Sequence, residues 1–395
     1  MSIRFLKHMD VKGKRLLIRV DFNVPMDQGV IREDMRIRAS LPTLQTALEQ
    51  GASLVLCSHM GSPKGQVIPE LSLKPAAEHL AGLLGKPVLM APDCIGPEVE
   101  KMAQTLQPGQ ILMLENLRFH PGETKNDPEF CRQLARLGEI YVNDAFGTSH
   151  RAHASTTGVA AHFSQCCAGL LMQKEWEYLG LTLADPQRPY VAISGGAKVS
   201  TKLGVLHNLL DKVDRLIIGG AMANTFIKSL GFAVGISLVE NDLLDEARKI
   251  MEKAKAKDVA LYLPVDFVFA PDPKAQAAGV CPYQNVPADQ MILDIGPATQ
   301  VLFAEVLATA GTAVWNGPMG AFENPDFAQG SLTVAKAVAE NARVSIVGGG
   351  DTDAMLHAAK MADKVSFIST GGGAFLEFME GKELPAFKAL RECSK

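Results

Sequence analysis

The feature that most constrains the fold is a recurring alternation of short apolar runs with glycine-containing turns and helical stretches. The runs are rich in Val, Ile and Leu, and their apolar character is continuous rather than alternating. Continuous runs are typical of strands buried on both faces, and strand–helix alternation favours parallel sheets with right-handed crossovers. The expected strands are Arg15–Val20, Ser53–Cys57, Ile111–Leu114, Ile140–Val142, Tyr190–Ile193, Arg215–Ile218, Val259–Leu263, Met291–Leu293, Ala313–Trp315, Val344–Val347 and Val365–Ile368.

These strands are too many for one compact sheet, so we expect two sheets, and the length of 395 residues also suits two domains. The boundary is expected in the segment 169–188, where apolar residues recur at roughly helical spacing before Asp185 and Pro186 end the helix. A hinge helix there would join a first domain, 1–168, to a second, 189–380. An ordinary surface helix inside one domain is the alternative.

Composition narrows the class of partner. Apolar residues make up 47% and charged residues 21% of the chain, as in globular proteins, and the net charge of −4 gives no basic field for nucleic acid. We expect no signal peptide and no membrane segment, and hence a cytoplasmic protein. The seven cysteines include no CxxC pair, and we expect them to be reduced thiols.

The turns after the strands of the second half are unusually rich in glycine. Because ligands bind beyond the carboxyl ends of parallel strands, and because glycine lets backbone N–H groups approach phosphate oxygens, these turns favour a nucleotide site. Tight strand–helix packing alone is the alternative. The turns are Ser194–Lys198, Gly219–Ala221, Asn316–Pro318, Gly348–Thr352 and Thr370–Gly373.

Charged residues beside these turns fit polyphosphate chemistry. Lys198 and Lys202, four apart at the start of an expected helix, would share one face and reach a phosphate chain; a solvated lysine pair is the alternative. Asp351 follows three glycines and is placed to hold Mg²⁺, or to cap a helix, and Glu323 is a candidate for the ribose. The absence of a Walker A motif and of GxGxxG argues against a P-loop ATPase and weakens a nicotinamide dehydrogenase as an alternative.

The first half carries arginines and histidines after its strands but no nucleophile motif. Asp21 and Asn23 alternate at strand spacing and would share a face that holds a hydroxyl, while arginine forks match carboxylate and phosphate geometry. His150 and His153 lack the pattern of a metal site, and no GxSxG elbow appears. We therefore expect an anionic small acid to bind in the first half.

Taken together, these segments resemble phosphoglycerate kinase over nearly the whole chain, from about Arg15 to Pro385. The resemblance rests on RVDFNVP, SHMG-PKG, LENLRF, YVNDAFGTSHRAHAST, ISGGAKVSTKL, IIGGAMANTF, VWNGPMGAFE, VGGGDT and STGGGAFLEF, which occur in this order. It implies two Rossmann-like α/β domains, each a parallel sheet flanked by helices and joined by a hinge helix. It also implies that the C-terminal segment 381–395 packs on the first domain.

The implied activity is a phosphotransferase reaction of glycolysis with a carboxyl group as acceptor. A phosphoryl group would pass reversibly from 1,3-bisphosphoglycerate to Mg-ADP, giving 3-phosphoglycerate and Mg-ATP, by direct in-line transfer after domain closure. The donor is already activated, so no covalent step is required. The resemblance also implies a cytoplasmic monomer with Mg²⁺ as the nucleotide's ion and no nucleic-acid or membrane partner.

The resemblance and the residues together assign the site. The phosphoglycerate site is expected to comprise Asp21, Asn23, Arg36, His59, Met60, Gly61, Ser62, Arg118 and Arg151. The nucleotide site is expected to comprise Gly195, Gly196, Ala197, Lys198, Lys202, Ala221, Leu293, Asn316, Pro318, Glu323, Gly349, Gly350, Asp351 and Thr352. The catalytic groups would be Arg36, Lys198, Lys202, Gly349 and Gly350, and the ligand of Mg²⁺ would be Asp351.

Two positions depart from the family pattern. Ser62 stands where the family usually has arginine, so the acid site is one guanidinium short unless Lys64 substitutes. Ala221 stands where glycine is usual, and its methyl group would narrow the adenine slot. Ser62 is the feature that favours the alternative of a non-catalytic binding or scaffold protein, whereas Arg36, Lys202 and Asp351 count against it.

Overall fold

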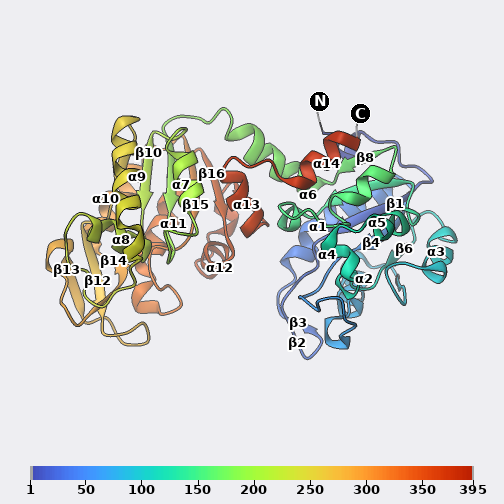
Figure 1. Cartoon of the computed structure of the whole chain (residues 1–395), viewed down its shortest axis with the longest axis horizontal. Helices are drawn as coiled ribbons and strands as arrows, with labels where there is room; N and C mark the ends of the chain where they lie inside the picture. Colours follow the sequence, from blue (N-terminus) through green and yellow to red (C-terminus); the bar gives the residue numbers. More distant parts are fainter. Residues whose placement is uncertain (1–2, 394–395) are drawn as a thin grey trace. The chain divides into compact units, whose positions relative to one another are not determined.

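The computed structural model describes residues 3–393. Contacts divide the chain into two compact units: the first unit comprises Met1–Glu177 with Glu383–Lys395, and the second unit comprises Tyr178–Lys382. The chain leaves the first unit inside the segment 169–188, for which the sequence predicts a hinge, and returns after Lys382. In Figure 1 the first unit therefore carries both the blue start and the red end of the chain.

The first unit is built on a parallel six-stranded sheet with the order β5-β6-β4-β1-β7-β8. Its strands are β1 (Arg15–Val20), β4 (Ser53–Cys57), β5 (Val88–Met90), β6 (Ile111–Met113), β7 (Ile140–Asp144) and β8 (Cys166–Ala168). The central strands β1, β4 and β7 are buried almost throughout, as their continuous apolar runs predict. The edge strands β5 and β8 are too short to show such a run, and the sequence did not predict them.

Helices and short turns connect these strands. The helices are α1 (Met35–Glu49), α2 (Lys74–Leu84), α3 (Pro97–Gln104), α4 (Pro121–Lys125), α5 (Pro128–Ala135) and α6 (Leu170–Glu175). The hairpin strands are β2 (Met26–Asp27) and β3 (Val30–Ile31), and the 3-10 turns are η1 (Leu6–His8), η2 (Pro69–Leu71), η3 (Leu117–Phe119), η4 (Phe146–Thr148) and η5 (Gly158–His162).

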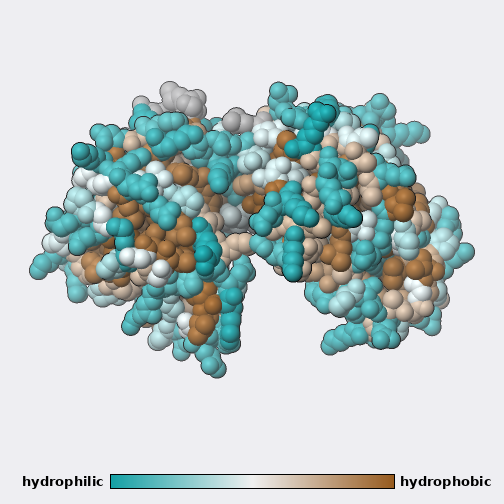
Figure 2. Space-filling view, turned by 180° about the vertical axis from the view of Figure 1, so that it is seen from behind, coloured by the Kyte–Doolittle hydropathy of each residue, from teal (hydrophilic) through white to brown (hydrophobic). Residues whose placement is uncertain are grey.

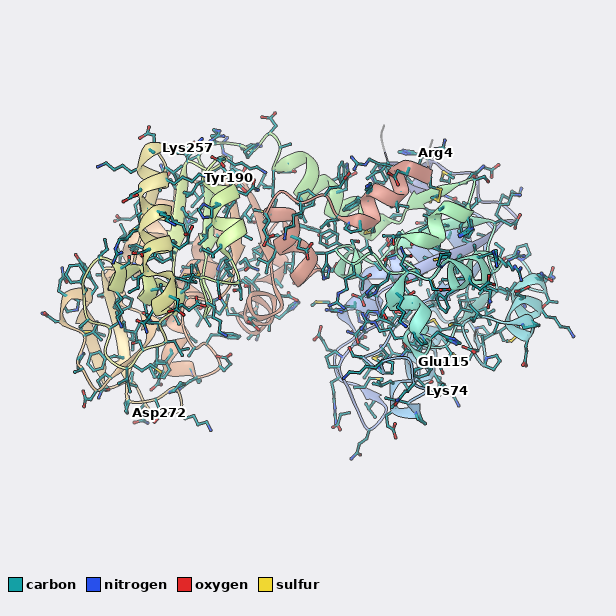
Figure 3. All side chains as sticks on the ribbon, in the orientation of Figure 1. Arg4, Lys74, Glu115, Tyr190, Lys257 and Asp272 are labelled. Carbon is teal, nitrogen blue, oxygen red and sulfur yellow. A yellow bond between two sulfur atoms is a disulfide. The ribbon has the colours of Figure 1, made fainter. Side chains whose placement is uncertain are left out.

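Side chains anchor the starts of two of these helices, α2 and α5. Glu115, just beyond β6, accepts hydrogen bonds from the Ser72 hydroxyl (2.7 Å) and the Leu73 N–H (2.9 Å), which anchors the start of α2 at Lys74 (Figure 3). The Asp127 carboxylate accepts from the Phe130 N–H at 2.9 Å and caps α5. The segment after β6 and the start of α2 are therefore held together.

The last helix, α14 (Pro385–Cys393), belongs to the first unit and packs against β8 and η5. Figure 1 shows α14 beside β8. Cys393 in this helix forms a disulfide with Cys166 of β8, and their Cα atoms are 5.9 Å apart. The expectation of seven reduced thiols is wrong for this pair. The two cysteines are 227 residues apart, so only the return of α14 brings them together.

The second unit has its own parallel six-stranded sheet, with the order β11-β10-β9-β15-β16-β17. The strands are β9 (Tyr190–Ser194), β10 (Arg215–Ile218), β11 (Ala260–Tyr262), β15 (Thr312–Asn316), β16 (Val344–Gly348) and β17 (Phe367–Ile368). β9 begins at Tyr190, labelled in Figure 3, and pairs with β15 so that Ser194 lies opposite Asn316. Two parallel sheets flanked by helices confirm the predicted fold class.

One of the strands expected in the parallel sheets belongs to a separate, antiparallel sheet. The run that begins at Met291 forms β14 (Met291–Ile295), which pairs antiparallel with β12 (Asp266–Ala270) in a small sheet that β13 (Gly279–Pro282) completes. Its inclusion among the strands of a parallel sheet was wrong. An apolar run reports burial of the strand and carries no information on the direction of its partner.

Helices again fill the connections of the second unit. They are α7 (Leu203–Leu209), α8 (Met222–Ser229), α9 (Leu244–Ala256), α10 (Pro297–Leu307), α11 (Gln329–Asn341), α12 (Gly350–Ala358) and α13 (Gly372–Met379), with the 3-10 turns η7 (Asn241–Leu243), η8 (Tyr283–Asn285), η9 (Pro325–Phe327) and η10 (Ala362–Lys364). After α6 the chain continues as a π-helical segment, η6 (Trp176–Thr182), so the expected hinge helix ends before Asp185.

The distribution of hydrophilic and apolar residues on the surface is that of a globular protein, as the composition predicts. Figure 2 shows hydrophilic residues over most of the visible face, with apolar residues in separate patches. Within residues 3–393, no helix combines the length and the apolar character needed to cross a bilayer.

Candidate active site

In the first unit, Arg36 forms hydrogen bonds with two residues of the loop that follows β1. Arg36 lies in the first turn of α1, and its Nη1 donates to Asp21 Oδ2 at 3.0 Å and to the Asn23 carbonyl oxygen at 3.2 Å. The prediction that Asp21 and Asn23 share a strand face was wrong, because β1 ends at Val20. The two residues nevertheless meet at one place because they bind the same guanidinium.

The loop after β4 joins the same cluster. The Asn23 side-chain oxygen accepts from the Gly61 N–H at 2.9 Å, and Arg118 Nη1 donates to the Gly61 carbonyl oxygen at 2.6 Å. The Met60 side chain, by contrast, is buried in the hydrophobic core, and both backbone polar groups of Met60 are hydrogen-bonded to the Asn116 side chain. The loops that follow β1, β4 and β6, together with the first turn of α1, are thus linked by hydrogen bonds.

A basic pocket of about 620 Å³ opens beside this cluster. It is lined by Ser62, Lys64, Gly65, Arg118, Pro121, Thr124, Lys125, Arg151 and His153. Four of these side chains are cationic and none is acidic, so the pocket suits a small anion. Ser62 lies on this lining, where an arginine would add a fifth cation.

Burial and neighbouring charge perturb two groups here. The pKa of His59 lies well below its usual value because the imidazole is buried and Arg19, Arg118, Arg151 and Arg36 all oppose its protonation. Burial, Arg151 and Arg19 together lower the pKa of Arg118 to about 10, which still leaves it charged at neutral pH. The site is therefore a set of guanidinium groups around a neutral imidazole.

In the second unit, a pocket of about 260 Å³ lies beside the glycine-rich turns. Seven of the residues predicted to bind nucleotide line it: Gly196, Ala197, Ala221, Leu293, Pro318, Glu323 and Asp351. Apolar groups, among them Phe267 and Met291, form much of the remaining wall, whereas Asp294, Glu323 and Asp351 are acidic. A largely apolar pocket with a few polar groups is what a base with a sugar and phosphates requires.

Glycine is required at two of the predicted positions. A Cβ atom on Gly195 would lie 2.2 Å from the Pro318 carbonyl oxygen, so the turn after β9 packs only without a side chain. Gly349 has a φ of +100°, and a Cβ there would lie 2.6 Å from Asn316 Nδ2. Packing therefore accounts for part of the glycine enrichment, as the alternative interpretation proposed.

Lys202 is buried where these turns converge. Its Nζ donates to the Gly195 carbonyl oxygen at 2.5 Å and to the Asn316 carbonyl oxygen at 2.8 Å. Burial lowers its pKa to about 7, and the charge of Asp351 partly opposes this shift. The end of β16 joins the same network, because Asn316 Nδ2 donates to the Gly348 carbonyl oxygen at 2.6 Å. The start of α12 joins it as well, because the Gly317 N–H donates to Thr352 Oγ1 at 2.8 Å.

The predicted helical face of two lysines is wrong. Helix α7 begins at Leu203, so Lys202 precedes it and Lys198 lies in the preceding turn, where it is exposed. Asp351 does not cap α12, because Gly349 occupies the N-cap position and Asp351 lies in the first turn.

Sequence reasoning missed several residues that build these sites. Arg19 and Glu123 are buried behind the acid site, and Lys125 lines its pocket. Phe267 and Asp294 line the pocket of the second unit. The position of Arg19 at the end of a buried strand was the one available signal, because an arginine inside an apolar run needs a partner.

Comparison with known proteins tests the family resemblance. A family model for phosphoglycerate kinase matches residues 6–382. The phosphoglycerate kinase of Maridesulfovibrio salexigens is 56% identical over 397 residues, covering 99% of this chain and 100% of that protein, and the one of Desulfotalea psychrophila is 53% identical over 98% of this chain and 100% of that protein.

Solved structures agree as well. The structure of phosphoglycerate kinase from Coxiella burnetii matches with a TM-score of 0.91 and 45% identity over 100% of both chains. The one from Pyrococcus horikoshii matches with a TM-score of 0.86 and 32% identity over 99% of both. The chain therefore belongs to the phosphoglycerate kinase family, whose reaction is the transfer of a phosphoryl group between 1,3-bisphosphoglycerate and ADP.

Proposed function

We propose that the first unit binds 3-phosphoglycerate or 1,3-bisphosphoglycerate in its basic pocket and that the second unit binds Mg-ADP or Mg-ATP in its glycine-lined pocket. The observation that carries this proposal is the contrast between the two pockets. One is lined by four cations, whereas the other joins an apolar slot to Asp351 and to the turn after β9. A phosphorylated acid fits the first, and a nucleotide fits the second.

For the acid, Arg118 and Arg151 are proposed to bind the phosphate of phosphoglycerate. Asp21 and Asn23 bind its hydroxyl, and Arg36 binds its carboxylate or acyl phosphate. Arg36 suits this task because its guanidinium is held by Asp21 and its side chain is still 37% exposed. An arginine with a fixed head group and an open face loses little freedom when it binds an anion.

For the nucleotide, the hard oxygen donors of Asp351 fit the Mg²⁺ ion that accompanies the phosphates. Lys198 and Lys202 neutralise phosphate charge, and the N–H groups of Gly349 and Gly350 at the start of α12 donate to the phosphoryl oxygens. Leu293 and Ala221 contact the base, and Glu323 contacts the ribose. No residue forms a covalent intermediate, because an acyl phosphate is already an activated donor.

Transfer requires the two bound substrates to meet in line with water excluded, and we propose that the two units close on each other to achieve this. We also propose that the chain works as a monomer in the cytoplasm. Both proposals extend the family assignment.

The decisive experiment is a coupled assay with 3-phosphoglycerate and Mg-ATP. Turnover supports the proposal, whereas a well-folded protein without turnover contradicts it. Calorimetry then separates the alternatives, because binding of both ligands without turnover would indicate the non-catalytic scaffold. Binding of NAD would instead indicate the dehydrogenase.

A further inference from the structure

A buried arginine holds the imidazole at the centre of the acid site. Arg19, on β1, is 1% exposed, and all three nitrogens of its guanidinium are used. Nε donates to the Ser155 hydroxyl at 2.8 Å, Nη1 donates to the Val20 carbonyl oxygen, and Nη2 lies 3.1 Å from His59 Nδ1. The guanidinium therefore has a single orientation.

The contact with Arg19 determines which nitrogen of His59 carries the proton. Guanidinium groups only donate hydrogen bonds, so Nδ1 of His59 must accept. A neutral imidazole that accepts through Nδ1 carries its proton on Nε2. Since the two ring nitrogens point in different directions, the Nε2–H points away from Arg19.

A fully buried carboxylate balances the charge of Arg19. Glu123, on α4, accepts hydrogen bonds from the Ser155 hydroxyl at 2.6 Å and from the Ser155 N–H at 2.9 Å. The Ser155 hydroxyl thus donates to Glu123 while it accepts from Arg19. This arrangement satisfies two buried charges through one bridging residue and leaves the other arginines to act on a ligand.

The other arginines around His59 also favour its neutral form, and the nearby carboxylate of Asp21 is paired with Arg36. Asp21 Oδ1 lies 3.9 Å from His59 Nδ1, but Arg36 already binds the other oxygen of this carboxylate. Arg118 and Arg151 add further positive charge near the ring. Among these groups, a neutral His59 supplies a directional hydrogen bond and the arginines supply the charge.

We propose that Arg19 is a positioning residue that fixes His59 as its Nε2–H tautomer, and that Glu123, acting through Ser155, holds Arg19 in place. His59 then donates from Nε2 to an oxygen of the anionic acid. The identity of that acid rests on the proposed function, whereas the tautomer does not.

The first test uses nuclear magnetic resonance of the wild-type protein labelled with ¹⁵N at histidine. The His59 resonances, assigned by their loss in His59→Gln, are expected to show a protonated Nε2 and an unprotonated Nδ1 across pH 6 to 8. A protonated Nδ1, or a doubly protonated ring at pH 7, would overturn the proposal. This measurement does not depend on turnover, so it remains decisive if the proposed activity is absent.

The second test removes the guanidinium. Arg19→Met is expected to give mixed His59 tautomers and to raise the KM for 3-phosphoglycerate about tenfold, with the KM for Mg-ATP unchanged. Arg15→Met, on the same strand but bonded to the Leu137 carbonyl oxygen, is the matched control and is expected to leave both values unchanged. An unaltered tautomer and KM in Arg19→Met would contradict the proposal.

If Arg19→Met does not fold, Ser155→Ala can replace it, because this variant disturbs the packing less. Its His59 tautomers and KM are compared with those of the wild type in the same way. It removes the hydroxyl bridge and keeps the backbone bond to Glu123. We expect the same changes in the His59 tautomers and in the KM for 3-phosphoglycerate as in Arg19→Met, but smaller. An unchanged His59 spectrum and an unchanged KM would show that the bridge does not position Arg19.

Discussion

The ammonium group of Lys202 donates a hydrogen bond of 2.8 Å to the carbonyl oxygen of Asn316, 114 residues further along the chain. The bond links the turn after β9 to the end of β15, its neighbour in the sheet. Because Lys202 is only 7% exposed, its charge is costly without these carbonyl partners. A charge held in this way can act on a phosphate that enters the adjacent pocket.

The burial of Lys202 predicts a pH-dependent stability. Its pKa is about 7 in the folded state and 10.5 in the absence of burial, so between these values the unfolded chain binds more protons. The free energy of unfolding of the wild type should therefore rise relative to that of Lys202→Met, by about 3 kcal/mol between pH 7 and 9.5. Urea unfolding of both proteins across this range measures the difference. Parallel pH profiles would show that Lys202 does not titrate there.

Lys202→Ala is expected to lower kcat by at least about a hundredfold, because its charge should act mainly on the transferring phosphoryl group. The KM for Mg-ATP should change less. Lys255→Ala, an exposed lysine at the end of α9, is a control that should keep wild-type kinetics. An unchanged kcat in Lys202→Ala would refute the catalytic role.

Ser62→Arg is expected to tighten 3-phosphoglycerate binding about tenfold, because it adds a charge-assisted hydrogen bond to a pocket that Arg118 and Arg151 already line. Titration calorimetry with 3-phosphoglycerate measures the change. Ser62→Lys, which adds charge without the planar fork, should gain less. Equal or weaker affinity in Ser62→Arg would show that Lys64 already fills the role.

Local sequence features predicted much of the fold. The bounds of β1 and β4 match the predicted runs residue for residue, because continuous apolar character directly reflects burial on both faces. The glycine-rich turns of the second half were likewise located, since the predicted Gly196 and Asp351 line one pocket. Both the apolar runs and the glycine-rich turns depend only on residues that are neighbours in the sequence.

What the sequence did not predict depends on distant parts of the chain. The antiparallel pairing of β14 is set by β12, and the Cys166–Cys393 bond is set by the return of α14. The role of Arg19 was hidden for a similar reason. Its partners Ser155 and His59 lie 136 and 40 residues away, and no spacing rule connects them.

Gly350→Ala separates a packing role from a ligand role. A Cβ atom on Gly350 would meet nothing within 4 Å, so the variant should fold with wild-type stability. If a phosphoryl oxygen approaches the Gly350 amide, the added methyl group should hinder it and lower kcat/KM for Mg-ATP at least about tenfold. Gly82→Ala, in α2, also has open space and is the control. Wild-type kinetics in Gly350→Ala would remove this amide from the proposed site.

The Cys166–Cys393 disulfide predicts that reduction loosens α14. The bond closes a loop of 227 residues, and the chain-entropy relation gives a stabilisation of up to about 5 kcal/mol for a loop of this length. With reductant, amide hydrogens of α14 and β8 should exchange faster, whereas those of β9 in the second unit should not change. Cys393→Ser should behave like the reduced wild type and be insensitive to reductant. Equal exchange in oxidised and reduced protein would show that packing of Phe387 against Trp176 and Phe146 suffices to hold the helix.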